Sequence, residues 1–144
     1  MKRFQDKTVV ITGGNSGIGR AAAERFRDEG ARVVIVGRNE AKVGQAAEEL
    51  GVEGLVADVA DNAALDAAFT SLKKKYGRVD VLFANAGVVE FAPISDVTSE
   101  HYERQTNINQ RGLLFTIQRA LPLLKEGSTV VVNTSVVTVV GMET

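Results

Sequence analysis

A glycine-rich stretch that directly follows a short apolar run is the feature that most limits how this chain folds. The apolar run covers residues 8–11, and the sequence Thr-Gly-Gly-Asn-Ser-Gly-Ile-Gly follows at positions 12–19. Ile18, Ala22 and Phe26 then recur every four residues, which is the spacing of one helix face. The stretch therefore predicts a strand, a tight turn and a helix in immediate succession.

Three glycines of this turn lie where a ligand such as a diphosphate would bind. Gly13 allows the tight turn, Gly17 lets the backbone approach a ligand, and Gly19 lets the helix lie against the sheet. The N–H groups of the first helical turn would face the diphosphate, and the helix dipole favours its negative charge. A turn of the same composition that binds no ligand is the alternative.

The composition excludes several classes of site and partner. The 144 residues suit one domain, and 17 basic against 18 acidic residues provide no electrostatic footprint for nucleic acid or an anionic membrane. The absence of cysteine excludes disulfides and thiolate metal sites, and a single histidine excludes a multi-histidine metal centre. No run approaches the roughly 18 apolar residues of a membrane span, and the first apolar run is too short for a signal peptide. We expect a soluble, cytoplasmic protein without a metal site.

Strand and helix signals alternate along the whole chain, which predicts a parallel sheet covered by helices. Strands are expected at residues 8–11, 31–36, 54–57, 79–84 and 129–135. Asn39 and Asp61 or Asn62 are expected to cap helices that end at Gly51 and Gly77, and a long helix is expected over residues 99–124. The pattern is that of a doubly wound α/β fold, in which ligands bind beyond the carboxyl ends of the strands.

Small or polar residues follow each expected strand. Beyond the glycine-rich turn these are Gly37 and Arg38, Asp58, Asn85 and Ser135. Because parallel strands end at one edge of the sheet, we expect these residues to surround one crevice.

These motifs resemble those of the classical short-chain dehydrogenase/reductase family. Positions 12–19 match its Thr-Gly-x-x-x-Gly-x-Gly motif, positions 85–87 its Asn-Ala-Gly element, and positions 109–112 the Asn-x-x-Gly of its long helix. The resemblance covers the whole chain with every motif in order, and it implies a Rossmann fold with strand order 3-2-1-4-5 and a dinucleotide-binding domain over residues 1–144. The cofactor-binding residues implied are Thr12, Gly13, Asn15, Ser16, Gly17, Ile18, Gly19, Arg38, Asp58, Val59, Asn85, Ala86 and Gly87.

The resemblance also implies hydride transfer between a nicotinamide cofactor and an alcohol or carbonyl substrate. Ser135 would hydrogen-bond the substrate oxygen, and Asn109 would hold a water that links an active-site lysine to bulk solvent. The family's Tyr-x-x-x-Lys, which exchanges the proton with that oxygen, lies beyond the serine, and neither Tyr76 nor Tyr102 has a lysine four positions on. We therefore expect an amino-terminal portion of a longer, homo-oligomeric enzyme that is inactive alone.

The valines at positions 130–132 agree with an incomplete sheet. Three consecutive apolar residues are typical of a strand buried on both faces with neighbours alongside, so we expect further strands beyond the fifth.

The residues after the second strand favour NADP over NAD. An acidic residue there would bind the ribose 2′-hydroxyl and repel a 2′-phosphate, but this chain has Gly37 and then Arg38. A guanidinium suits a phosphate through its charge and its paired donors. The alternative is that Arg38 lies over the start of the second helix and pairs with Glu40. Asp58 likewise has an alternative role, as the cap of the next turn.

Three other functions are alternatives to an NADP-dependent oxidoreductase. A nucleotide-binding module without turnover has the same motifs as far as Thr144. A methyltransferase that uses S-adenosylmethionine would need an acidic residue ending the second strand, which Gly37 and Arg38 do not supply. A serine hydrolase of Ser135 with His101 lacks the glycines that flank a nucleophile elbow. The sequence indicates only one wall of a substrate pocket, at residues 88–91.

Overall fold

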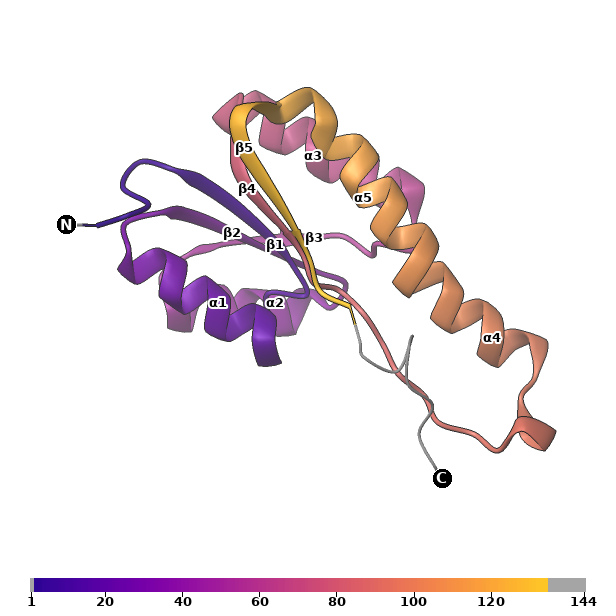
Figure 1. Ribbon diagram of the computed structural model, residues 1–144. Helices are drawn as coiled ribbons and strands as arrows, with labels where there is room; N and C mark the ends of the chain where they lie inside the picture. The colour runs from indigo at the N-terminus through magenta and orange to yellow at the C-terminus, as the bar shows by residue number, and fades with distance from the viewer. Residues whose placement is uncertain (1, 135–144) are drawn as a thin grey trace.

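The five strands form one parallel sheet in the order β3-β2-β1-β4-β5, as predicted. The computed structural model describes residues 2–134 of the chain. The strands are β1 (Thr8–Thr12), β2 (Arg32–Gly37), β3 (Glu53–Val56), β4 (Val79–Ala84) and β5 (Leu124–Val132). The α-helices are α1 (Gly17–Asp28), α2 (Glu40–Leu50), α3 (Asn62–Tyr76), α4 (Ser99–Thr106) and α5 (Leu113–Ala120). Helices α1 and α2 cover one face of the sheet, and α3 and α5 cover the other (Figure 1).

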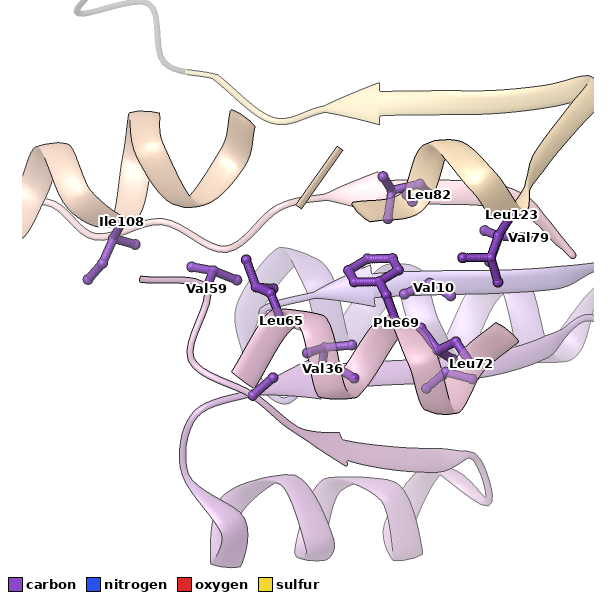
Figure 2. Packing of buried hydrophobic residues seen from close by; sticks show 14 residues of the cluster. Val10, Val36, Val59, Leu65, Phe69, Leu72, Val79, Leu82, Ile108 and Leu123 are labelled. Atoms are coloured by element: carbon purple, nitrogen blue, oxygen red, sulfur yellow. The ribbon is translucent and has the colours of Figure 1, made fainter. Parts of the chain in front are cut away.

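The core has two parts, one on each face of the central strand β1. Every residue of β1 is buried, because β1 pairs with β2 on one side and with β4 on the other. Leu65, Phe69 and Leu72 of α3 pack with Val10 and other strand residues on one face (Figure 2). Residues of α1 and α2 pack on the opposite face. The three central strands, β2, β1 and β4, are therefore buried on both faces, as their continuous apolar residues indicate.

Asp80 anchors the amino ends of the two central strands. Its carboxylate accepts hydrogen bonds from the Thr8 N–H at 2.9 Å and from Arg78 Nε at 2.7 Å, and Lys7 Nζ lies 3.7 Å away. Burial alone would raise the pKa of Asp80, but these hydrogen bonds and the charges of Arg78 and Lys7 outweigh burial and lower the pKa. Asp80 thus holds the amino ends of β1 and β4, at the opposite edge of the sheet from their carboxyl ends.

The predicted helix caps are confirmed. Asn39 Oδ1 accepts a hydrogen bond from the Lys42 N–H at 2.9 Å, and Asp61 caps α3 through the N–H groups of Ala63 and Ala64. Gly51 and Gly77 end α2 and α3 in the left-handed conformation.

Ile18 does not belong to the packing face of α1, contrary to the spacing argument. Its side chain is 65% exposed, whereas Gly19 and Ala23 are the buried residues of the helix. The reason is that the first turn of α1 packs against the glycine loop through Gly19, which turns Ile18 toward solvent.

The fifth strand and the long helix also differ from the prediction. Strand β5 begins at Leu124, five residues earlier than the expected Thr129, with an irregularity opposite residues 79–81 of β4. As the outer strand of the described sheet, it leaves Val130, Val131 and Val132 38–44% exposed, so the expected burial on both faces is absent here.

The long helix is interrupted by a π-helical segment, Asn107–Gly112, and ends in a 3-10 turn, Leu121–Leu123. Gly112 permits this segment to approach the loop after β3, because a Cβ there would lie 2.9 Å from Val59 Cγ2 and 3.0 Å from the Val59 carbonyl oxygen. A short 3-10 turn, Ile94–Asp96, precedes α4.

Candidate functional site

A cavity of about 310 Å³ lies at the carboxyl ends of the strands. The segments that follow β1, β2, β3 and β4 line it, together with Ile108 of the π-helical segment. The predicted residues among its lining are Gly13, Asn15, Ser16, Arg38, Asp58, Val59, Ala86 and Gly87. Four strand ends thus meet around one crevice, as the sequence predicts. A more open hollow of about 420 Å³ lies between α3 and α5, lined by residues such as Phe69 and Arg119, and includes none of the predicted site residues.

The glycine loop disfavours side chains at Gly13 through its backbone conformation and at Gly19 through close packing. Gly13 has a φ of +66°, and its N–H donates to the Val36 carbonyl at 2.7 Å. A Cβ on Gly19 would lie 2.3 Å from the Gly13 carbonyl oxygen and 2.6 Å from Asn85 Nδ2. The start of α1 therefore lies directly on the turn after β1, and only glycine at position 19 fits that contact.

The first turn of α1 offers unpaired donors beside the cavity. The N–H groups of Gly17, Ile18 and Gly19 have no acceptor among residues 2–134, and Ser16 makes no side-chain cap. A Cβ on Gly17, whose φ is +50°, would meet nothing within 4 Å. Open space and free N–H groups at a helix N-terminus suit an anionic group such as a diphosphate. Gly17, Ile18 and Gly19 do not themselves line the cavity, so their place is at its rim beside Ser16.

Thr12 and Asn85 join the ends of three strands. Thr12 Oγ1 accepts hydrogen bonds from the N–H groups of Asn85 at 3.0 Å and Ala86 at 3.1 Å. Asn85 Nδ2 donates to the Thr12 carbonyl at 3.2 Å, and Asn133 Nδ2 donates to Asn85 Oδ1 at 2.9 Å. Neither Thr12 nor Asn85 lines the cavity, so in this structure they fix the loops that do.

Asn109 clamps the segment that follows the Asn-Ala-Gly element. Its Oδ1 accepts from the Val88 N–H at 2.8 Å, and its Nδ2 donates to the Val88 carbonyl at 2.7 Å. Val88 lines the cavity, so Asn109 acts here as a positioning residue. Its relay role through a bound water stays a prediction.

Arg38 and Asp58 both line the cavity, but of the two side chains only that of Asp58 is held by a hydrogen bond among the described residues. Asp58 Oδ1 accepts from the Ala60 N–H at 2.9 Å, so Asp58 both caps its own turn and contributes to the cavity wall. The Arg38 guanidinium makes no hydrogen bond or ion pair among the described residues, and the expected alternative pairing with Glu40 is absent from them. A cation without a partner thus lines the cavity beyond β2.

Several lining residues were not anticipated from the sequence. Val36 is the penultimate residue of β2, Ala57 directly follows β3, and Ile108 directly precedes Asn109. The signal for Lys42 in the sequence is that it is a basic residue in the first turn of α2, four positions after Arg38. Ser135, the predicted catalytic serine, lies outside the described residues.

The parallel sheet with this strand order and the cavity at its carboxyl end place the chain in the class of Rossmann-fold proteins. The family model for short chain dehydrogenase matches residues 7–143, and the chain belongs to this family of oxidoreductases.

Several oxidoreductases are similar to this chain in sequence or in structure. The chain is 41% identical over 131 residues to oxidoreductase asL5 of Sarocladium schorii, covering 88% of this chain and 51% of that protein. It is 37% identical over 142 residues to levodione reductase of Leifsonia aquatica, covering 92% and 53%. A solved short-chain dehydrogenase from Brucella melitensis superposes with a TM-score of 0.93 at 30% identity, covering 99% of this chain and 63% of that one. The chain spans about half the length of the curated relatives it matches.

Within residues 2–134, no helix has the length and apolar character to cross a bilayer. The same part of the chain contains no group of three or more histidine, aspartate or glutamate side chains placed to hold a metal ion.

Proposed function

We propose that this chain binds NADP(H) for an oxidoreductase that interconverts an alcohol and a carbonyl compound. One observation carries the proposal: a cavity lies at the strand ends, and among residues 2–134 no group pairs with the helix N–H groups beside it or with the Arg38 guanidinium in its wall. A dinucleotide has a diphosphate at its centre, and NADP has a second phosphate on its adenosine ribose. The two anionic positions match the two sets of donors.

The described residues fit the cofactor by the chemistry of their donors. The N–H groups of Gly17, Ile18 and Gly19 would bind the diphosphate, and Arg38 would bind the 2′-phosphate. Asp58 and Val59 would contact the adenine side. When bound, the cofactor supplies or accepts the hydride.

Residues of this chain would position the reacting groups. Asn109 holds Val88 by two hydrogen bonds. Val88 is the first of residues 88–91, which we propose as one wall of the substrate pocket. Asn133 is bonded to Asn85, which brings the end of β5 beside the end of β4. Ser135 follows closely and would donate a hydrogen bond to the substrate oxygen. A tyrosine and a lysine of the family motif, from sequence after Thr144, would exchange the proton at that oxygen.

Cofactor titration tests the proposal directly. Binding of NADPH and NADH to the full chain is measured by cofactor fluorescence, with Arg38→Ala and a control, Lys74→Ala, that removes an exposed charge on α3. We expect tighter binding of NADPH, a loss of that preference in Arg38→Ala, and no change in the control. NADH that binds at least as tightly as NADPH would overturn the NADP assignment.

The second candidate is a nucleotide-binding module without turnover, and the span of about half the relatives' length favours keeping it. Sequence of the parent transcript beyond codon 144 distinguishes the two, since an enzyme requires Tyr-x-x-x-Lys there. A panel of ketones with NADPH then tests turnover by the whole protein, which we propose to be a cytoplasmic homo-oligomer.

A further inference from the structure

Two positively charged side chains line the same cavity. Arg38 follows β2, Lys42 lies in the first turn of α2, and Gly37 and Asn39 line the wall with them. Among residues 2–134, neither the Arg38 guanidinium nor the Lys42 ammonium forms a hydrogen bond or an ion pair. The acidic residue between them in sequence, Glu40, is not part of the lining and pairs with neither.

The backbone fixes where the two cations start. The Lys42 N–H donates to Asn39 Oδ1 at 2.9 Å, which ties the first turn of α2 to the residue after Arg38. Gly37 holds the end of β2 close to the glycine loop, since a Cβ there would lie 2.5 Å from Asn15 Oδ1 and 2.9 Å from Val43 Cγ2. Both side chains thus extend from rigid positions next to the loop proposed to bind the diphosphate.

Two neighbouring cations repel each other unless an anion lies between them. A phosphate monoester carries about −1.5 to −2 charges near pH 7, so it can satisfy a guanidinium and an ammonium together. A ribose 2′-hydroxyl offers no such charge. We infer that Lys42 is a specificity-determining residue that binds the cofactor 2′-phosphate together with Arg38. This inference rests on the proposed function, because it presumes a cofactor with a 2′-phosphate.

Fragments of the cofactor isolate this part of the site. We would titrate the full chain by calorimetry with adenosine 2′,5′-bisphosphate and with 5′-AMP, which lacks the 2′-phosphate. The variants are Lys42→Met and Arg38→Met, which keep apolar stems and remove the charges, and Lys74→Met is the matched control on α3. One charge-assisted hydrogen bond to a partly exposed phosphate corresponds to about tenfold in affinity.

We expect Lys42→Met to weaken the bisphosphate about tenfold and to leave 5′-AMP within twofold, while Lys74→Met changes neither. The affinity of the bisphosphate should also fall less steeply with added salt in Lys42→Met than in the parent. If Arg38→Met is selective and Lys42→Met is not, the inference about Lys42 is wrong and the NADP assignment stands. If the parent binds the two fragments equally, both the inference and the NADP assignment are overturned.

Discussion

Replacing Gly19 by alanine tests the packing on which the candidate site depends. The added Cβ would lie 2.3 Å from the Gly13 carbonyl oxygen and 2.9 Å from the Gly13 carbonyl carbon. These are backbone atoms of the turn after β1, so no rotation of a side chain relieves the contact. Either α1 moves away from the sheet or the turn after β1 shifts.

The cost follows from the size of that displacement. Overpacking a well-packed interior costs about 1–3 kcal/mol, and a clash with backbone belongs at the upper end, near 3 kcal/mol. For a chain of this length, each kcal/mol lowers the melting temperature by about 2–4 °C. We therefore expect Gly19→Ala to melt about 6–12 °C below the parent.

Gly17→Ala is the matched control, because the same methyl group two residues earlier would meet nothing within 4 Å. Its cost is that of placing an alanine at a φ of +50°, about 1 kcal/mol. Urea unfolding of the full chain without cofactor, followed by far-UV circular dichroism, measures both variants. A Gly19→Ala chain no less stable than Gly17→Ala would refute the packing argument. Gly17→Val adds a second arm, since it should abolish cofactor binding with the fold largely intact.

Three other substitutions probe features away from the glycine loop. Asp80→Asn should cost about 1–2 kcal/mol at pH 7 by urea unfolding. Because folding lowers the pKa of Asp80, the parent should lose this stability as pH falls below about 4, and the variant should show a smaller loss. Tyr76→Phe should cost about 1 kcal/mol, because the Tyr76 hydroxyl donates to Glu53 of β3; an unchanged urea midpoint would contradict this. Asn109→Ala should speed hydrogen exchange at the Val88 amide about tenfold or more, and an unchanged rate would show that another group protects it.

The fold followed from local signals that act over few residues. Asn39, Asp61, Gly51 and Gly77 were placed correctly because a helix end is decided by its own capping geometry. The parallel sheet followed from apolar strands separated by helices, whereas its strand order followed from the family resemblance.

What the sequence did not reveal depends on contacts between distant segments. The spacing of Ile18 gave no sign that α1 meets the sheet first at Gly19, because that contact is set by the turn at Gly13. The early start of β5 depends on Ser128, whose Oγ donates to the Val79 carbonyl at 2.7 Å, 49 residues away in sequence. The π-helical segment depends likewise on the fit of Gly112 against Val59.

The candidate site was predictable in its location but less so in the roles of its residues. The rule that ligands bind beyond strand ends brought Arg38 and Asp58 to one cavity. It could not distinguish lining residues from those that hold the lining in place. Thr12 and Asn85 hold the loops in place through a hydrogen bond between residues 73 positions apart in sequence. Lys42 lines the cavity because it lies in the helix turn that Asn39 caps.

The two edge strands of the described sheet differ in length and in how they are held. β3 is four residues long, and Glu53 at its start is engaged by Lys75 and Tyr76 of α3. β5 is nine residues long, and within residues 2–134 no strand borders its outer side. Of the two edges among the described residues, β5 therefore presents the longer row of unpaired backbone N–H and C=O groups, and it is the edge at which a further strand can extend the sheet.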